Sequence, residues 1–217
     1  MRIGVCVKQV PAGSARMDGE TGLLIRDSVG GTLNPYDLFA LEAALQAAQG
    51  AAQQAAQTAD EAIRAGSAAT RRAGGRGEVF AITMGPPPAE QALREALALG
   101  ADAAVLLSDP AFSGADVAAT SRALAEGVRK YGVPDLIFCG RQTTDGDTAQ
   151  LPFALAARLG LPVVGWVTGI EYFREDGYSV VQELSGGAAR VRGAYPALFA
   201  VGREAVQPRP PSLTRRL

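Results

Sequence analysis

The sequence predicts an α/β protein with a doubly wound, mostly parallel sheet, an antiparallel hairpin extension and an extended C-terminal tail. Two observations predict the sheet. Short runs of nearly continuous apolar residues are bounded by Gly, Pro or Asp, which is typical of strands covered on both faces. Between them lie segments with apolar residues at helical spacing, and this alternation favours parallel strands joined by right-handed helical crossovers.

Each element follows from its own stretch of sequence. The expected buried strands are residues 2–10, 78–84, 103–107, 136–139, 162–167 and 195–202. The expected helices are residues 36–48, 88–100, 115–132 and 151–160. Gly100 and Gly160 follow two of these helices and act as stop signals, because glycine readily adopts the conformation that ends a helix.

Three stretches depart from the alternation. Residues 49–75 are rich in Ala and Gln, and we expect an exposed helix with a flexible end, either a solvated insertion or a partner-binding segment. Residues 168–194 carry an Asp-Gly turn between alternating runs, which predicts antiparallel strands that extend the sheet. Residues 207–217 are proline-rich and basic, as in an extended arm. We therefore expect one domain over residues 1–206, followed by a tail.

Composition excludes several classes of function. The 217 residues are 47% hydrophobic and 20% charged, with a net charge of −1 and no histidine, so neither a nucleic-acid surface nor a histidine-based catalytic or metal site is expected. No apolar run approaches the roughly 18–20 residues of a membrane span, and no signal peptide is expected at the start of the sequence. Cys6 and Cys139 lie in apolar strands and are expected to be reduced core thiols, which favours a cytoplasmic protein.

The most informative segment is the loop "GRQTTDGDTAQ", residues 140–150, between an expected strand and an expected helix. Amides of such a loop and of the helix start favour phosphate, and Thr148 and Gln150 add side-chain donors. Asp145 and Asp147 repel phosphate but suit ribose hydroxyls or an adenine amino group. Neither a P-loop nor a GxGxxG fingerprint is present. The residues alone leave two readings open, a nucleotide loop or a capped polar turn.

Three further segments are expected at the same edge of the sheet, where ligands of open α/β folds bind. The first, "KQVPAGSAR" (8–16), follows the first expected strand. In "NPYD", residues 34–37, Asn34 suits an N-cap, Pro35 the first helical position and Asp37 the positive end of the helix. A helix-start signal alone explains this stretch equally well. Met84 ends an expected strand before a proline-stiffened turn and is a candidate wall of the same pocket.

Several motifs, in this order, resemble the beta subunit of electron transfer flavoprotein. They are "VCVKQVP" (5–11), "NPYDLFALEAAL" (34–45), "ITMGPPPAEQALREALALGAD" (82–102), "LLSDPAFSGAD" (106–116), "DLIFCGRQTTDGDTAQ" (135–150) and "PSL" (211–213). The resemblance implies a heterodimer with an alpha subunit that carries most of the site for a redox-active FAD. It also implies that the beta subunit buries AMP in simple carriers or a second FAD in electron-bifurcating members. The motif "DGDTAQ" (145–150) is more similar to that of the bifurcating members.

The resemblance also implies which residues act. The cofactor-binding residues carried over by motif are Cys6, Asn34, Pro35, Tyr36, Asp37, Met84, Gly140, Arg141, Gln142, Thr143, Thr144, Asp145, Gly146, Asp147, Thr148, Ala149, Gln150 and Leu151. Leu213 matches the leucine that anchors the family's docking loop on acyl-CoA and related flavin dehydrogenases. Two features depart from the family: Leu151-Pro152 stands where Gly-Pro is usual, and this sequence ends at Leu217, before the family's basic arm.

The expected function is therefore that of a non-catalytic electron-carrier subunit, with no membrane insertion, no metal and no nucleic-acid partner. Flavin shared with the alpha subunit would carry the electrons between a dehydrogenase and an acceptor. The alternative is a stand-alone adenine-nucleotide-binding module of the same superfold, similar to stress proteins. A nucleotide-cleaving or adenylating enzyme is a third reading, but no SGGxDS-type pyrophosphate loop is present.

Overall fold

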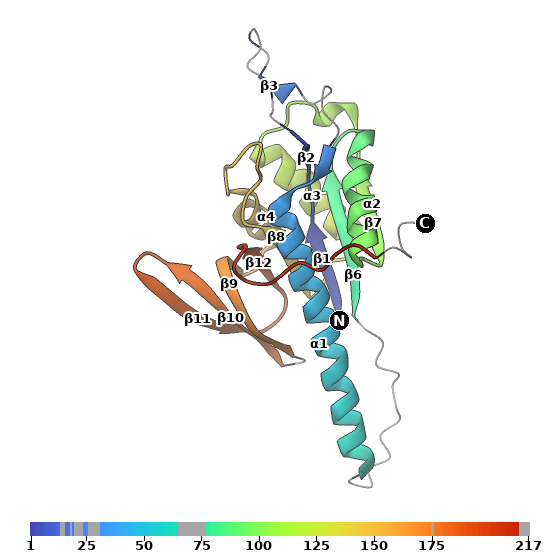
Figure 1. The fold of residues 1–217 in the computed structure, drawn as a ribbon, viewed down its shortest axis with the longest axis vertical. Coiled ribbons are helices and arrows are strands. Elements are labelled where there is room, and N and C mark those ends of the chain that lie inside the picture. The colour runs from blue at the N-terminus through green and yellow to red at the C-terminus, as the bar shows by residue number, and fades with distance from the viewer. Residues whose placement is uncertain are drawn as a thin grey trace.

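A computed structural model describes residues 1–13, 16–17, 19, 24–25, 31–64, 77–174 and 176–212 (Figure 1). Its centre is an eight-stranded sheet in the order β11-β10-β9-β12-β8-β1-β6-β7. The strands of this sheet are β1 (Arg2–Cys6), β6 (Glu78–Met84), β7 (Ala103–Leu107), β8 (Leu136–Gly140), β9 (Val163–Arg174), β10 (Gly177–Leu184), β11 (Gly187–Gly193) and β12 (Ala197–Val201). Neighbours from β9 to β7 in this order run parallel, and β10 and β11 are antiparallel, which confirms the predicted sheet with its hairpin extension.

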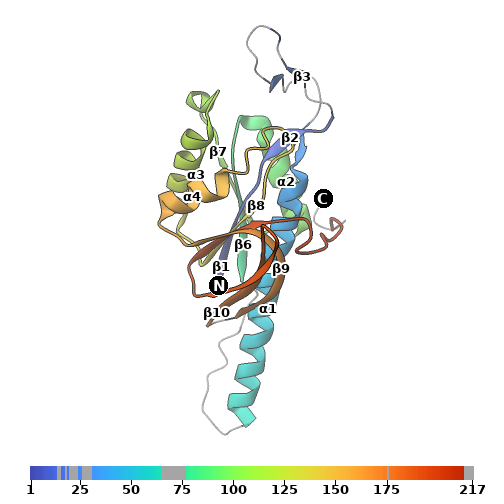
Figure 2. The same cartoon turned by 90° about the vertical axis from the view of Figure 1, so that its left-hand side faces the viewer.

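Helices cover both faces of the sheet. The helices are α1 (Pro35–Arg64), α2 (Glu90–Leu99), α3 (Val117–Tyr131) and α4 (Leu151–Leu159), with short 3-10 turns η1 (Pro87–Ala89) and η2 (Pro110–Phe112). Figure 2 shows α1 and α2 on one face and α3 and α4 on the other. The doubly wound arrangement follows from the chain passing from β7 through α3 to β8, on the far side of β1.

The two faces bury separate apolar clusters. On the α1 side, Leu41 and Leu45 pack with Ile3 and Phe138 of the sheet. On the α3 and α4 side, residues such as Leu124 and Leu155 pack with the opposite faces of the same strands. Side chains of successive strand residues alternate between these clusters, which is why the strands read as continuous apolar runs in the sequence.

The predicted strand 2–10 is interrupted, and the interruption begins the functional region. β1 ends at Cys6, and a separate short strand, β2 (Gln9–Pro11), pairs with β5 (Gly31–Leu33). Between them the backbone of Lys8 leaves the sheet, because its amide donates to Asp37 and its carbonyl accepts from the amide of Asn34. A further small pair, β3 (Arg16–Met17) with β4 (Leu24–Ile25), lies beyond β2.

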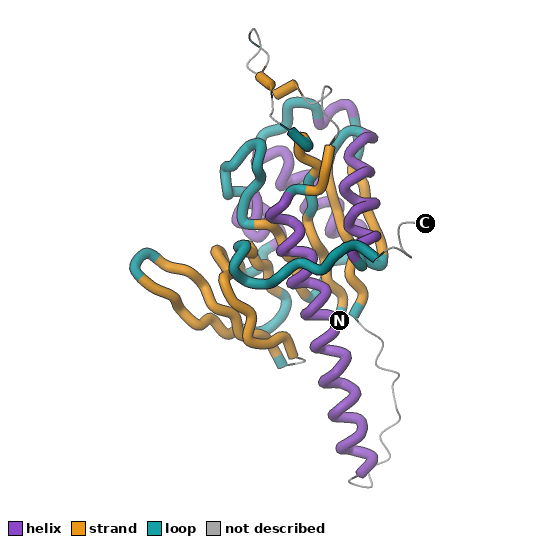
Figure 3. The backbone as a smooth tube through the Cα atoms, viewed as in Figure 1, coloured by secondary structure: helices purple, strands orange, loops and turns teal. Residues whose placement is uncertain are grey.

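The peripheral segments agree with the pattern of the sequence. Helix α1 continues past the sheet as far as Arg64, so the predicted core helix and the Ala-rich helix are one element (Figures 1 and 3). Residues 65–76 of the predicted insertion lie outside the described part of the chain. Residues 202–212 form neither helix nor strand, and we call this segment the strap. Among the described residues, no helix is both long and apolar enough to span a membrane.

Candidate functional site at the sheet's switch point

The candidate site lies at the carboxyl ends of β1 and β8, where the strand order reverses direction. The chain winds from β1 outward to β6 and β7, and then returns to place β8 on the other side of β1. Ligands of open α/β sheets bind at such a switch point, because the connecting segments there diverge to opposite faces. Lys8, the start of α1 and residues 140–150 meet at this point.

Asn34 ties the start of α1 to the loop. Its side-chain amide donates to the Gln142 carbonyl over 3.0 Å, and its side-chain oxygen accepts from the Thr144 amide over 3.3 Å. The residue is fully buried. α1 does begin at Pro35, as predicted, but the Asn34 side chain makes these two bonds to the loop rather than serving only the helix start. A buried amide with both ends engaged fixes the loop against the helix.

Asp37 and Gly140 bring the helix start and the end of β8 into direct contact. The Asp37 carboxylate accepts from the Lys8 amide over 2.8 Å, and the residue is only 4% exposed. Burial raises the pKa of this carboxyl to about 7, although hydrogen bonds from Asn34 and from the Lys8 and Gly140 amides oppose that rise. A Cβ on Gly140 would lie 2.4 Å from Asp37 Oδ1 and 2.8 Å from the Tyr36 carbonyl carbon, so this position requires glycine.

Lys8 brings an ammonium group to the loop, which itself contains no lysine. Its Nζ lies 2.8 Å from Asp145 Oδ1, and the Asp145 side chain is only 3% exposed. Burial raises the pKa of Asp145, but the hydrogen bond and the charge of Lys8 outweigh burial and leave that pKa below its ordinary value. Sequence analysis placed the segment that begins at Lys8 at this edge of the sheet, because the segment follows a buried strand, but it assigned no role to Lys8 itself.

The second half of the loop has an unusual backbone. Asp147 and Ala149 have positive φ, 47° and 53°, a conformation that costs an alanine about 1–2 kcal/mol. Gly146 is not among the positive-φ residues, and a Cβ there would only touch Thr143 Oγ1 at 3.7 Å. The left-handed backbone conformation in this loop therefore occurs at Asp147 and Ala149 and not at Gly146. Such strain persists only where the surroundings hold it, and it is often found at ligand sites.

The loop ends at a helix start without a side-chain cap. Gln150 stands at the N-cap of α4 and makes no capping bond, while Pro152 occupies the first turn. Among the described residues, no hydrogen bond engages the amides of Thr148, Ala149 or Gln150. Three successive amides at the positive end of a helix are a suitable cradle for an anion.

The other predicted site residues fall into three groups. Tyr36, Gln142, Thr143 and Thr144 take part in the contacts around Asn34 and Gly140. Cys6 and Met84 lie at the same sheet edge, but both pack in the apolar cluster on the α3 and α4 side. Cys6 is the register partner of Cys139, and both are buried free thiols, as expected. Hydrogen bonding with Cys6 and burial raise the pKa of Cys139. Leu213 lies outside the described residues.

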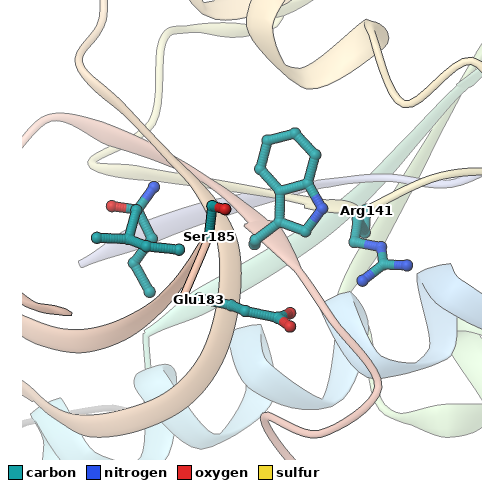
Figure 4. A pocket seen from close by; sticks show the side chains of 6 residues that line it. Arg141, Glu183 and Ser185 are labelled. Carbon is teal, nitrogen blue, oxygen red and sulfur yellow. The ribbon is translucent and has the colours of Figure 1, made fainter. Parts of the chain in front are cut away.

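A pocket of about 490 Å³ adjoins the loop (Figure 4). Its lining residues are Arg141, Trp166, Gln182, Glu183, Leu184 and Ser185. Arg141 connects the pocket to the loop, of which it is the second residue. Trp166 is 39% exposed and sits at a register shift of β9 with φ of 46°. Its ring centroid lies 5.5 Å from that of Phe153 at the start of α4. Sequence analysis gave no sign of this pocket, because Trp166 reads as an ordinary strand residue.

The fold and this edge of the sheet define a Rossmann-like α/β protein. At its switch point lies a loop, residues 140–150, that Asn34 and Lys8 hold in place. The model of the electron transfer flavoprotein domain matches residues 47–216. The chain is 42% identical over 211 residues to the caffeyl-CoA reductase-Etf complex subunit CarD of Acetobacterium woodii, covering 96% of this chain and 71% of that protein. It is 40% identical over 214 residues to the electron transfer flavoprotein subunit beta of Thermoanaerobacterium thermosaccharolyticum, covering 98% and 72%.

A third relative is protein FixA of Azorhizobium caulinodans, 44% identical over 197 residues, with 88% of this chain and 62% of FixA covered. The chain therefore spans about two thirds of the length of these relatives. It belongs to the electron transfer flavoprotein family, among the beta subunits, as its motifs predict. Two of these three relatives are named as a subunit of an Etf complex and as an electron transfer flavoprotein subunit beta.

Proposed function

We propose that this chain is an electron-carrier beta subunit that binds an adenine nucleotide, AMP or a second FAD, in the loop of residues 140–151. One observation carries the proposal: the amides of Thr148, Ala149 and Gln150 lack partners among the described residues and stand at the uncapped N-terminus of α4. Amides in this position bind phosphate without requiring a positive side chain. Their location at the switch point of the sheet supports the same ligand class.

The surrounding residues suit different parts of the nucleotide. Thr148 is exposed beside the free amides and is suited to a phosphate oxygen. Asp147 is exposed and is suited to ribose hydroxyls or the adenine amino group. Asp145 is less suited to that direct role, because its nearly buried carboxylate is already engaged by Lys8. We propose that Asp145 instead fixes the loop through Lys8.

The number of phosphates follows from charge. The two acids of the loop disfavour a triphosphate, and the ammonium of Lys8 does not reverse this argument because Asp145 already pairs with it. A ligand with one or two phosphates, AMP or the adenylate end of FAD, fits this balance best. A second FAD would support electron bifurcation, whereas AMP would support a simple carrier.

Flavin shared with an alpha subunit would carry out the redox chemistry. The residues of this chain would bind the adenine nucleotide and orient the subunits around the flavin. We propose that the chain acts as a cytoplasmic heterodimer with that subunit, without inserting in a membrane, and that Leu213 contacts an acyl-CoA or other flavin dehydrogenase. The chain alone is expected to bind reducible flavin poorly, because the part of the chain that the structure describes holds a single nucleotide loop.

The test is to co-express the chain with an alpha subunit of the same family and to purify the complex natively. Heat denaturation should release nucleotides that chromatography identifies. One FAD with one AMP supports a simple carrier, and two FAD support bifurcation. If the purified complex contains no adenine nucleotide, the loop is not a nucleotide site. The alternative, a capped polar turn, would then stand. Stoichiometric reducible flavin in the purified single chain would refute the need for a partner subunit.

A further inference from the structure

The strap, residues 202–212, crosses α1 and reaches α2 (Figures 1 and 3). Near its start, Ala205 and Val206 pack against the apolar cluster on the α1 side of the sheet. At its far end, the Ser212 amide donates to the Ala98 carbonyl in the last turn of α2 over 3.0 Å. Pro210 and Pro211 lie between the two fastened regions and are exposed.

An ion pair between the half-buried Arg209 and the buried Glu42 fastens the strap to α1. Arg209 donates from Nε to Glu42 Oε2 over 2.6 Å, from Nη2 to Oε1 over 2.9 Å, and from its backbone amide to Oε2 over 3.3 Å. Gln46 also donates to Oε1 over 2.9 Å. The Glu42 side chain is only 6% exposed. Burial raises the pKa of Glu42, but the bonds from Arg209 and Gln46 outweigh burial and leave that pKa lowered.

This pair fixes geometry more than it stabilises the fold. An ion pair with a buried carboxylate loses solvation, so apolar residues of similar volume would stabilise the fold as well or better. A forked guanidinium on a carboxylate instead specifies one orientation of the segment that carries it. Only two residues lie between Arg209 and the second anchor at Ser212. Prolines occupy both positions between these anchors, and their fixed φ leaves the segment little freedom.

We propose that Glu42 and Arg209 are a positioning pair for partner docking. They hold residues 209–212 in one conformation before the partner arrives, directly ahead of Leu213. This inference rests on the proposed docking of Leu213, and the partner it fits is a flavin dehydrogenase with an apolar pocket for that leucine. A pre-ordered segment loses less conformational entropy on binding, so unfastening it weakens docking without altering the residues that touch the partner.

The experiment uses the heterodimer and the flavin dehydrogenase that reduces the wild-type complex. The variant Glu42→Gln keeps the shape of the side chain and removes its charge. We expect about a tenfold rise in the KM for the dehydrogenase, with kcat and nucleotide content unchanged. Reduction by dithionite should also be unchanged, and the amide of Ser212 should exchange hydrogen faster. The matched control is Arg203→Gln, which removes an exposed ion pair to Glu204 from the same strap and should leave the KM unchanged.

Two further variants separate the possible failures. The double variant Glu42→Gln with Arg209→Gln leaves no buried charge unpaired and should give the same rise in KM, so it serves if the single variant folds poorly. Leu213→Ala tests docking itself. If Leu213→Ala weakens reduction and neither Glu42 variant does, the positioning inference is wrong while docking stands. If Leu213→Ala has no effect, the docking part of the proposed function is wrong; a raised KM in the Glu42 variants would then still support positioning of the strap.

Discussion

Lys8 Nζ lies 2.8 Å from Asp145 Oδ1, and this contact joins two residues that are 137 positions apart in the chain. The lysine follows β1 and the aspartate lies in the loop after β8. Because β1 and β8 are adjacent strands, the ion pair links the two segments that leave the sheet at the switch point. The same lysine uses its backbone amide to hold Asp37. Lys8 therefore connects the start of α1 with the loop of residues 140–150.

Lys8→Met is expected to loosen the loop while leaving the fold intact. The substitution leaves the nearly buried carboxylate of Asp145 without its cation, which costs about 1–3 kcal/mol for an unsatisfied buried group. We expect nucleotide occupancy of the purified heterodimer to fall at least about tenfold, as measured by chromatography after denaturation. The double variant Lys8→Met with Asp145→Asn should recover much of the stability. Full occupancy in Lys8→Met would show that the pair does not organise the site.

Asp37 predicts a pH dependence of folding. Its pKa is about 7 in the folded protein against an ordinary value of 3.8, so between these values the folded state binds more protons than the unfolded state. The stability associated with the protonated group is fully present below pH 3.8 and is lost as pH rises through 7. The change is at most about 4 kcal/mol, at ~1.4 kcal/mol for each pKa unit.

Denaturant unfolding of wild type and Asp37→Asn at several pH values measures this effect. Other carboxylates titrate in the same range in both proteins, so the readout is the difference in the free energy of unfolding between them. Wild type should lose stability relative to Asp37→Asn as pH rises from about 4 to about 7. Parallel curves would show that Asp37 titrates near its ordinary pKa.

How far the sequence predicts this site depends on the type of contact. Apolar runs and helical spacing predicted the strands and helices, because each depends on neighbouring residues. The Asp-Gly turn likewise predicted the hairpin of β9 and β10. The pairing of Lys8 with Asp145 and the clamp formed by Asn34 depend on strand order, which local patterns do not specify. The register shift that exposes Trp166 also has no local signal, since tryptophan with positive φ is rare.

Two glycines in the loop are expected to respond in opposite ways. Gly140→Ala should destabilise the fold by several kcal/mol, because its Cβ would overlap Asp37 Oδ1 and the backbone of Tyr36. Gly146→Ala should cost the fold about 1 kcal/mol or less, since its Cβ has space. If the backbone at Gly146 approaches the ligand, Gly146→Val should empty the site. Thermal unfolding and nucleotide content separate the cases; retained nucleotide in Gly146→Val would place the ligand elsewhere.

A substitution at Ala149 tests whether backbone strain in the loop serves nucleotide binding. Its φ of 53° is unfavourable for alanine and easy for glycine, so Ala149→Gly should raise the free energy of unfolding by about 0.5–1 kcal/mol. Ala157→Gly is the matched control, because this exposed residue lies inside α4 and should lose about 0.5–1 kcal/mol by the same substitution. If the strain aligns the free amides for phosphate, Ala149→Gly should also weaken nucleotide binding severalfold, through a more mobile loop. Calorimetric titration of the emptied complex with AMP measures that loss. Equal destabilisation by both glycines would mean that Ala149 is not strained in solution.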